Sequence, residues 1–268
     1  MTNGPARRRW LQAAACSVLP ACVLGSGPAA ATLPEVIARL RGSVLPVGTY
    51  SPTDSPRFGF RGTCFVVGDG NLVATNFHVL PPAAETATGA RLAVMAGRSG
   101  DLGQLRMATL VGSDRARDLA LLRIDGPPLV PVALDGAGSA REGQSIALMG
   151  YPIGGALGFS PVTHRGIVAS VTQIALQAPT AQQLDPRAIS RLRGGNFEVL
   201  QLDATAYPGN SGGPVFDADS GVVLAVLNMV LVKSSRESAL SQPTGISYAI
   251  PVRHLLALLA EQPAAAPR

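Results

Sequence analysis

The chain has 268 residues, of which 47% are hydrophobic, so it is long enough and apolar enough to bury a large core. Its formal net charge of +5 at first suggests nucleic-acid binding. Three basic residues, Arg7 to Arg9, lie in a stretch of 31 residues without any acid, which leaves 19 of the 22 basic residues against all 17 acidic ones. That near balance excludes the charge footprint of a nucleic-acid-binding protein, and we expect no such partner.

Residues 1–31 have the pattern of an export signal. The run ARRRWLQAAACSVLPACVLGSGPAAA starts with basic residues, continues with a short apolar stretch and ends in three alanines. The apolar stretch is interrupted by Pro20 and Gly25 and is too short for a membrane span. We therefore predict a signal peptide over 1–31 and a periplasmic or secreted mature protein.

Three kinds of signal fit this leader. It reads as an ordinary Sec signal, but RRRWL also resembles the twin-arginine export pattern. The stretch LPAC at 19–22 resembles a lipoprotein box with an atypical proline, in which Cys22 would carry a lipid anchor and bring the protein to a membrane. The sequence leaves the three alternatives open.

Cysteine usage agrees with an exported protein that relies on its core for stability. Cys16 and Cys22 lie in the leader, so cleavage at Ala31 leaves Cys64 as the only cysteine. The mature chain then has no intramolecular disulfide. We interpret Cys64 as a small core residue with no redox role.

The mature chain begins and ends with helical patterns. Thr32, Pro34 and Glu35 form a helix start before a short amphipathic run that leads into a strand. Residues 251–262, PVRHLLALLAEQ, form a second amphipathic pattern that begins with proline, and we expect this helix to pack on the last strands. The tail 263–268 is predicted to be disordered.

Between these helices, from about 44 to 250, short apolar runs are separated by turn residues. A Gly-Asp-Gly-Asn sequence at 68–71 predicts a hairpin. A long polar stretch at 177–196 predicts a surface loop. Many short strands predict an all-β barrel or sandwich instead of alternating βαβ units. The runs are GTCFVVGDGNLVATN, RLAVMAG, MATLVGS, LALLRID, SIALMG, GIVASVTQI, FEVLQLDA and GVVLAVLNMV.

Ser211, in DATAYPGNSGGPVFD at 203–217, is the candidate nucleophile. A serine hydroxyl needs an imidazole to take its proton and a carboxylate to orient that imidazole. Among the three histidines, only His78 follows the end of a predicted strand and is preceded by polar residues, in LVATNFHVL. The carboxylate candidate is Asp118 in SDRARDLALLRID, because it immediately precedes an apolar strand.

Five motifs together resemble the trypsin-like serine proteases, and most closely the HtrA/Deg branch. They are GTCFVVGDGNLVATNFHVL, DLALLRID, MGYPIG, YPGNSGGPVFD and GISYAIP, in the order and approximate spacing of that family over roughly residues 44–252. The resemblance implies two six-stranded antiparallel β-barrels with short N-terminal and C-terminal helices, and a protease domain over 32–262. The order His, Asp, Ser is opposite to that of the α/β-hydrolases, which share the Gly-x-Ser-x-Gly pattern.

The resemblance also assigns roles. Ser211 would be the nucleophile, His78 the general base and later acid, and Asp118 the group that fixes the histidine tautomer. The N–H groups of Gly209 and Ser211 would form the oxyanion hole, aided by Asn210 between them. No metal and no cofactor are implied.

Substrate preference is predicted from the residues at the primary pocket. Thr205, six residues before the nucleophile, would lie at the base of the pocket, and it is not a carboxylate. Leu227, Asn228 and Met229 would supply its walls, which suggests a small aliphatic residue before the scissile bond. The alternative is that these three are core strand residues.

Two features depart from the family pattern. HtrA proteins usually carry PDZ domains after the protease domain, and we expect none in this chain. The 177–196 loop is longer than the pattern suggests. Its role is left open between a lid, an oligomer contact and an exosite.

The expected function is an exported serine endopeptidase acting on polypeptides. The alternative is a catalytically silent protease-fold module that binds unfolded polypeptide.

Overall fold

The computed structural model describes residues 1, 31–82, 85–86, 89–97, 104–138, 140–152, 154, 158–173, 197–229 and 245–262. The predicted signal peptide, apart from its two end residues, lies outside the described residues, as do the predicted loop 177–196 and the tail 263–268. Within the described ranges, no helix is long and apolar enough to cross a membrane.

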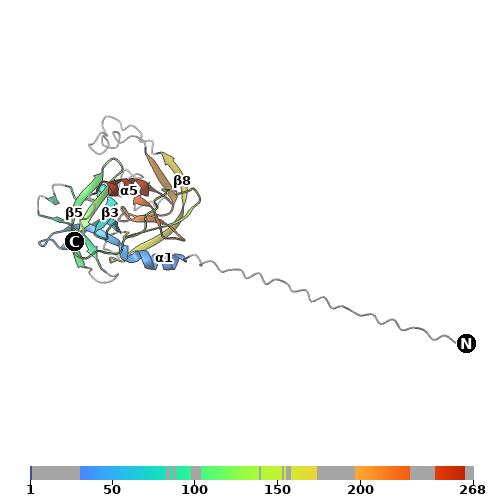
Figure 1. Cartoon of the computed structure of the whole chain (residues 1–268). Helices are drawn as coiled ribbons and strands as arrows, with labels where there is room; N and C mark the ends of the chain where they lie inside the picture. Colours follow the sequence, from blue (N-terminus) through green and yellow to red (C-terminus); the bar gives the residue numbers. More distant parts are fainter. Residues whose placement is uncertain are drawn as a thin grey trace.

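Two closed antiparallel barrels form the body of the protein, in the strand orders β1-β2-β3-β6-β5-β4 and β10-β11-β12-β9-β8-β7 (Figure 1). This confirms the fold class that the motifs imply. The strands of the first barrel are β1 (Val44–Tyr50), β2 (Phe58–Val67), β3 (Leu72–Asn76), β4 (Arg91–Ala96), β5 (Gln104–Asp114) and β6 (Leu119–Ile124). Those of the second are β7 (Ser145–Gly150), β8 (Val162–Gln173), β9 (Glu198–Asp203), β10 (Pro214–Asp217), β11 (Val223–Asn228) and β12 (Ile246–Pro251).

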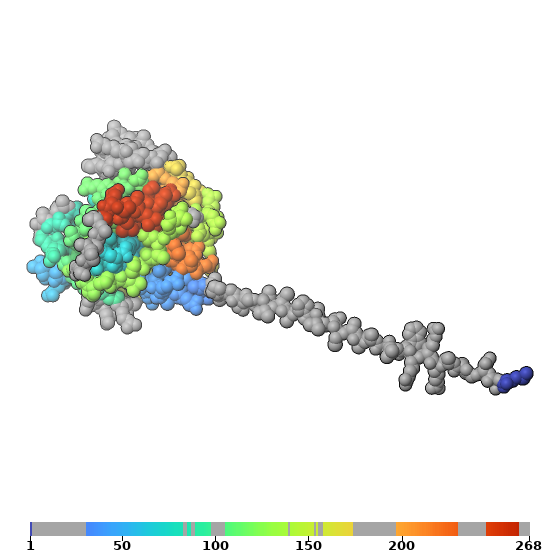
Figure 2. All heavy atoms as spheres, in the orientation of Figure 1, coloured from blue at the N-terminus to red at the C-terminus, as the bar shows by residue number. Residues whose placement is uncertain are grey.

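Two helices flank the barrels, as predicted. Helix α1 (Leu33–Leu40) begins where the backbone N–H and hydroxyl of Thr32 donate to the Glu35 carboxylate at 2.7 and 2.9 Å. Helix α5 (Val252–Ala260) follows β12 directly, with Pro251 as its N-cap. Figure 2 shows α5 lying on the surface of the barrel body. Two 3-10 turns, η1 (Arg41–Ser43) and η2 (Phe77–Val79), precede β1 and follow β3.

Alternating side chains of β2 serve two different cores. Cys64 and Val66 point into the first barrel, where they join one buried cluster. Phe65 and Val67 point out of it, into a cluster shared with strands of the second barrel and with both helices. The interface between the barrels is therefore itself a hydrophobic core, which rigidly positions loops from the two barrels against each other.

The segment 125–144 connects the barrels and lies along both of them. The N–H of Leu129 donates to Gly70 and that of Val132 donates to Val66, at 2.9 and 3.0 Å, both in the first half of the protein. Farther on, the N–H of Asp135 donates to the Val223 carbonyl of β11 at 2.9 Å. The connection is thus anchored to each barrel in turn.

Candidate active site

His78 and Asp118 form a direct pair at the edge of the first barrel. His78 lies in η2, immediately after β3, and Asp118 ends the turn between β5 and β6. His78 Nδ1 lies 2.5 Å from Asp118 Oδ2, and the backbone N–H of His78 donates to Oδ1 at 2.8 Å. The side chains are 18% and 20% exposed, so the pair is shielded but open on one side. Two carboxylate contacts fix both the position and the ring orientation of the histidine.

The backbone of Asp118 is held in an uncommon conformation. Its φ of 57° makes it the one non-glycine residue with positive φ among the described residues. Its carbonyl accepts hydrogen bonds from the Phe77 N–H and from Asn76 Nδ2, both at 3.0 Å. A conformation of this kind persists only where surrounding contacts determine it, and such positions concentrate at functional sites.

Asn228, at the end of β11, supports the same carboxylate from the second barrel. Its Nδ2 donates to Asp118 Oδ2 at 2.8 Å, and the residue is fully buried. The side chain that was predicted as a wall of the substrate pocket is thus bonded to Asp118 in this structure. A single amide at the end of an otherwise apolar strand was the available signal, but its partner lies 110 residues away in the sequence.

Two successive tight turns present Ser211. In the first, the Asn210 N–H donates to the Tyr207 carbonyl at 3.0 Å, and Gly209 has φ 100°. In the second, the Gly213 N–H donates to the Asn210 carbonyl at 3.0 Å. Positive φ at the third residue of a turn with proline at the second position favours glycine, which explains the Pro208-Gly209 sequence.

The N–H groups of Gly209 and Ser211 are available to a ligand. Within the described residues neither group donates a backbone hydrogen bond. The Asn210 N–H is committed to Tyr207, and the Asn210 side chain is fully buried. Asn210, which the resemblance assigns to the oxyanion hole as an aid to its two neighbours, therefore has its N–H bonded within the loop.

The Ser211 hydroxyl is bonded to a backbone N–H and makes no hydrogen bond to the imidazole. Ser211 Oγ accepts a long hydrogen bond of 3.4 Å from the Met229 N–H, and it makes none to His78 in this structure. Hydrogen bonds between nucleophile and base are often long or absent before substrate binds. The chain thus brings the three predicted residues to one edge of the barrel interface, with the His78–Asp118 bond already formed.

The predicted pocket residues have different environments. Thr205 is half-buried, in the loop that follows β9. Met229 is partly buried against the core of the second barrel, and its N–H contacts Ser211 Oγ. Leu227 is fully buried in that core, so the alternative of a core strand residue holds for it.

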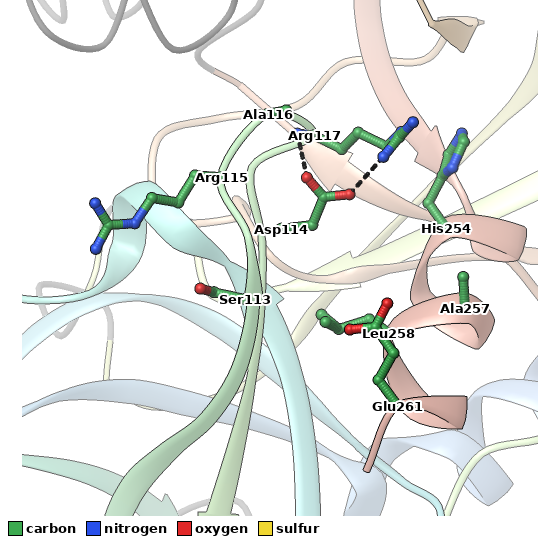
Figure 3. A pocket seen from close by; sticks show the side chains of 9 residues that line it. All are labelled: Ser113, Asp114, Arg115, Ala116, Arg117, His254, Ala257, Leu258 and Glu261. Carbon is green, nitrogen blue, oxygen red and sulfur yellow. Dashed lines mark hydrogen bonds and ion pairs between the residues drawn. The ribbon is translucent and has the colours of Figure 1, made fainter. Parts of the chain in front are cut away.

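The other two histidines lie elsewhere. The ring of His164 on β8 is tilted against that of Tyr207, with centroids 5.6 Å apart, and burial lowers the pKa of His164. His254 on α5 lines a hollow of about 550 Å³ behind the Asp118 turn. Figure 3 shows His254 beside Arg117, which is paired with Asp114. Burial, reinforced by the Arg117 and Arg253 guanidinium groups, lowers the pKa of His254 to about 4.

The hollow does not have the charge of a defined ligand site. Its guanidinium groups, from Arg115 and Arg117, are matched by the carboxylates of Asp114 and Glu261. Arg117 is already bonded to Asp114, through its backbone N–H at 3.0 Å and its guanidinium at 2.7 Å. This cluster is best described as support for the turn that carries Asp118.

Cys64 lies inside the first barrel. The thiol is fully buried, lies 3.4 Å from the Leu45 carbonyl, and burial raises its pKa. A protonated, inaccessible thiol is unreactive, which agrees with the interpretation of Cys64 as a core residue.

Known proteins resemble this chain in both sequence and fold. Residues 62–226 match the trypsin-like peptidase domain. A DegP-like periplasmic serine endoprotease of Pseudomonas fluorescens is 28% identical over 192 residues, covering 71% of this chain and 32% of that protein. Serine protease PepD of Mycobacterium tuberculosis is 26% identical over 226 residues, covering 84% of this chain and 46% of PepD. The chain thus spans from about a third to a half of these curated relatives.

Solved structures agree on the fold. The HtrA-type protease AlgW with a tripeptide superposes with a TM-score of 0.58 at 22% identity, over 86% of this chain and 63% of that chain. The serine endoprotease from Yersinia pestis gives the same TM-score and identity, over 86% and 66%. With a family match over more than half of its length, the chain belongs to the trypsin-like peptidases, among which its relatives are HtrA and DegP serine proteases.

Proposed function

We propose that this protein is an exported serine endopeptidase that hydrolyses peptide bonds through His78, Asp118 and Ser211. The observation that carries the proposal is the 2.5 Å contact between His78 Nδ1 and Asp118 Oδ2, next to a serine loop with two uncommitted N–H groups. A binding module has no need for an oriented imidazole beside such a loop. The family match supports the same chemistry.

The first half of the reaction acylates Ser211. The hydroxyl leaves the weak Met229 N–H contact and donates to His78 Nε2, which takes the proton as Oγ attacks the peptide carbonyl. Asp118 stabilises the imidazolium that forms. The negative oxygen of the tetrahedral intermediate accepts hydrogen bonds from the Gly209 and Ser211 N–H groups. His78 then gives its proton to the leaving amine, and the C–N bond breaks.

The second half releases the product. Water donates a proton to His78 and attacks the ester carbonyl of the acyl-enzyme. The same two N–H groups stabilise the second tetrahedral intermediate, and the proton returns to Ser211 as the ester bond breaks. No atom outside the chain, the substrate and water is needed to balance either half.

The substrate residue before the scissile bond is proposed to be small and aliphatic. Thr205 and Met229, the two predicted pocket residues that are not fully buried, offer no charge to a Lys or Arg side chain. A peptide-library cleavage profile tests this point. Cleavage after Lys or Arg would contradict it.

The site of action is proposed to be the periplasm or the outside of the cell. The leader at 1–31 supports export, and several relatives are named periplasmic endoproteases. Mass spectrometry of the mature N-terminus separates the alternatives, because cleavage after Ala31 gives an unmodified Thr32. A lipoprotein would instead begin with a diacylated Cys22. Sedimentation of the same sample reports the oligomeric state.

A fluorophosphonate probe tests the enzyme proposal directly. We expect the wild-type protein to be labelled at Ser211 and to cleave unfolded casein, and Ser211→Ala to do neither while keeping its melting temperature. Absence of both labelling and cleavage in the wild type, together with binding of unfolded casein, would favour the binding module instead.

A further inference from the structure

Thr63 crosses from the first barrel to the serine loop of the second. It lies on β2, is fully buried, and its Oγ1 donates to the Gly209 carbonyl at 2.7 Å. Its backbone N–H donates to the Ser211 carbonyl at 2.9 Å. One residue of the first barrel therefore bonds to both residues whose N–H groups are proposed to form the oxyanion hole.

The Thr63 hydroxyl fixes the orientation of one peptide unit. The unit between Gly209 and Asn210 has its carbonyl bonded to Thr63 Oγ1 and its N–H bonded to the Tyr207 carbonyl. With both ends held, the unit cannot rotate about its flanking bonds. The two neighbouring units carry the Gly209 and Ser211 N–H groups, and their direction depends on this central one.

A further hydrogen bond directs the hydroxyl itself. The Tyr151 N–H, just after β7, donates to Thr63 Oγ1 at 3.0 Å. Because this bond occupies a lone pair of Thr63 Oγ1, the hydroxyl hydrogen points toward the Gly209 carbonyl. Thr63 is itself held in place, since its carbonyl accepts from the Thr75 hydroxyl at 2.7 Å.

The serine loop, residues 209–212, is already packed tightly against Thr63 on β2. A Cβ at Gly212 would lie 2.2 Å from the Thr63 carbonyl oxygen, and one at Gly150 would lie 3.0 Å from Thr63 Oγ1. A carbon in place of Oγ1 would also lie 2.7 Å from the Gly209 oxygen, whereas such a carbon and oxygen stay at least about 3.3 Å apart. Removing the hydroxyl while keeping the volume must therefore displace the Gly209 carbonyl.

We propose that Thr63 is a positioning residue for peptide hydrolysis. Its hydroxyl, which lies in the first barrel, holds the 209–211 loop of the second barrel in the conformation that directs the Gly209 and Ser211 N–H groups at the substrate. The inference rests on the proposed function of Ser211 and adds a residue to it. Thr63 does not touch the substrate; it acts through the Gly209–Asn210 peptide unit. Its loss weakens binding of the transition state and leaves binding of the substrate nearly unchanged.

The test compares three variants of the full-length protein. Thr63→Val removes the hydroxyl, Thr63→Ser restores it, and Ser43→Ala is the matched control. Ser43 is equally a buried residue whose hydroxyl donates to a carbonyl, that of Val130 at 2.7 Å, but it does not contact the serine loop. Each variant is assayed for melting temperature, for kcat and KM on a fluorogenic peptide, and for affinity toward a peptide boronic acid.

We expect Thr63→Val to lower kcat by about 100-fold, the usual loss for an oxyanion donor, with KM within about threefold of the wild type. Boronate affinity falls by a similar factor, because the boronate adduct mimics the tetrahedral intermediate. Serine restores kcat to within about fivefold, and Ser43→Ala leaves it within about twofold.

A loss of kcat below about tenfold in folded Thr63→Val, or an equal loss in Ser43→Ala, overturns the inference. If Thr63→Val does not fold, the smaller Thr63→Ala is judged by the same limits. The wild type separates this failure from that of the proposed function. If fluorophosphonate labels Ser211 in the wild type and Thr63 variants keep full kcat, only the role of Thr63 is refuted.

Discussion

Replacing Asn228 by alanine removes one of the hydrogen-bond donors to Asp118, the proposed catalytic carboxylate. In the wild type, Asp118 Oδ2 is shared between His78 Nδ1 at 2.5 Å and Asn228 Nδ2 at 2.8 Å. A hydrogen bond to a charged group contributes about 1.5–3 kcal/mol. At about 1.4 kcal/mol for each tenfold change, Asn228→Ala should lower kcat/KM by roughly 10- to 150-fold.

The structure also gives an upper limit to this loss. Both contacts between Asp118 and His78 survive in Asn228→Ala, so the imidazole keeps its orientation. Asp118→Asn, which disturbs the tautomer itself, should cost about 10⁴-fold in kcat. The two variants are therefore expected to differ by at least tenfold, with Asn228→Ala the more active.

Stopped-assay kinetics on a fluorogenic peptide, together with thermal unfolding, measure both effects. Asn71→Ala is the control, because its amide also donates to carbonyls, at 3.2 and 2.9 Å, but in the hairpin turn of the first barrel. It should lower the melting temperature without changing kcat/KM. An Asn228→Ala enzyme within twofold of the wild type would refute the argument that Asn228 supports Asp118.

Three further predictions follow from the packing and the pKa shifts. Gly212→Ala should abolish measurable hydrolysis, because its Cβ would lie 2.2 Å from the Thr63 oxygen at a φ of 85°; a folded, active variant would contradict this. Cys64 should resist a thiol reagent in the folded protein and react only after denaturation, as peptide mass mapping would reveal; fast labelling of the native state would disprove its burial. Burial lowers the pKa of His254 to about 4, so the folded state binds fewer protons than the unfolded state between about pH 4 and 6.5, and stability falls as the pH decreases through that window. His254→Gln should therefore lose less melting temperature than the wild type between about pH 7 and 5, and parallel losses would refute this linkage.

Local sequence signals predicted most of the fold. Strand patterns such as those of β6 and β11 follow from runs of apolar residues, and α1 follows from its start at Thr32 and Glu35. Strand β10 was missed, because its four residues begin with proline and read as part of the serine loop. Barrel closure came from the family resemblance, since strand pairing across a barrel is not a local property.

The sequence predicted those site residues whose side chains have a recognisable catalytic chemistry. Ser211, His78 and Asp118 could be found because nucleophile, base and carboxylate are rare in their settings. Thr63 and Asn228 could not, because each is a lone polar residue in an apolar strand, and its meaning depends on a partner 146 or 110 residues away. The positive φ of Asp118 has only a weak sequence signal, since aspartate adopts this conformation more often than most residues but neither neighbour is glycine.

The connection 125–144 gives the barrel arrangement a practical consequence. It joins two complete barrels, one with His78 and Asp118 and the other with Ser211, and it is the covalent link between the two halves of the site. A chain divided within this connection would yield two fragments that each hold an incomplete and inert set of residues. Their shared apolar interface would then make proteolytic activity a direct readout of whether the fragments have found each other, which is the requirement for a split reporter.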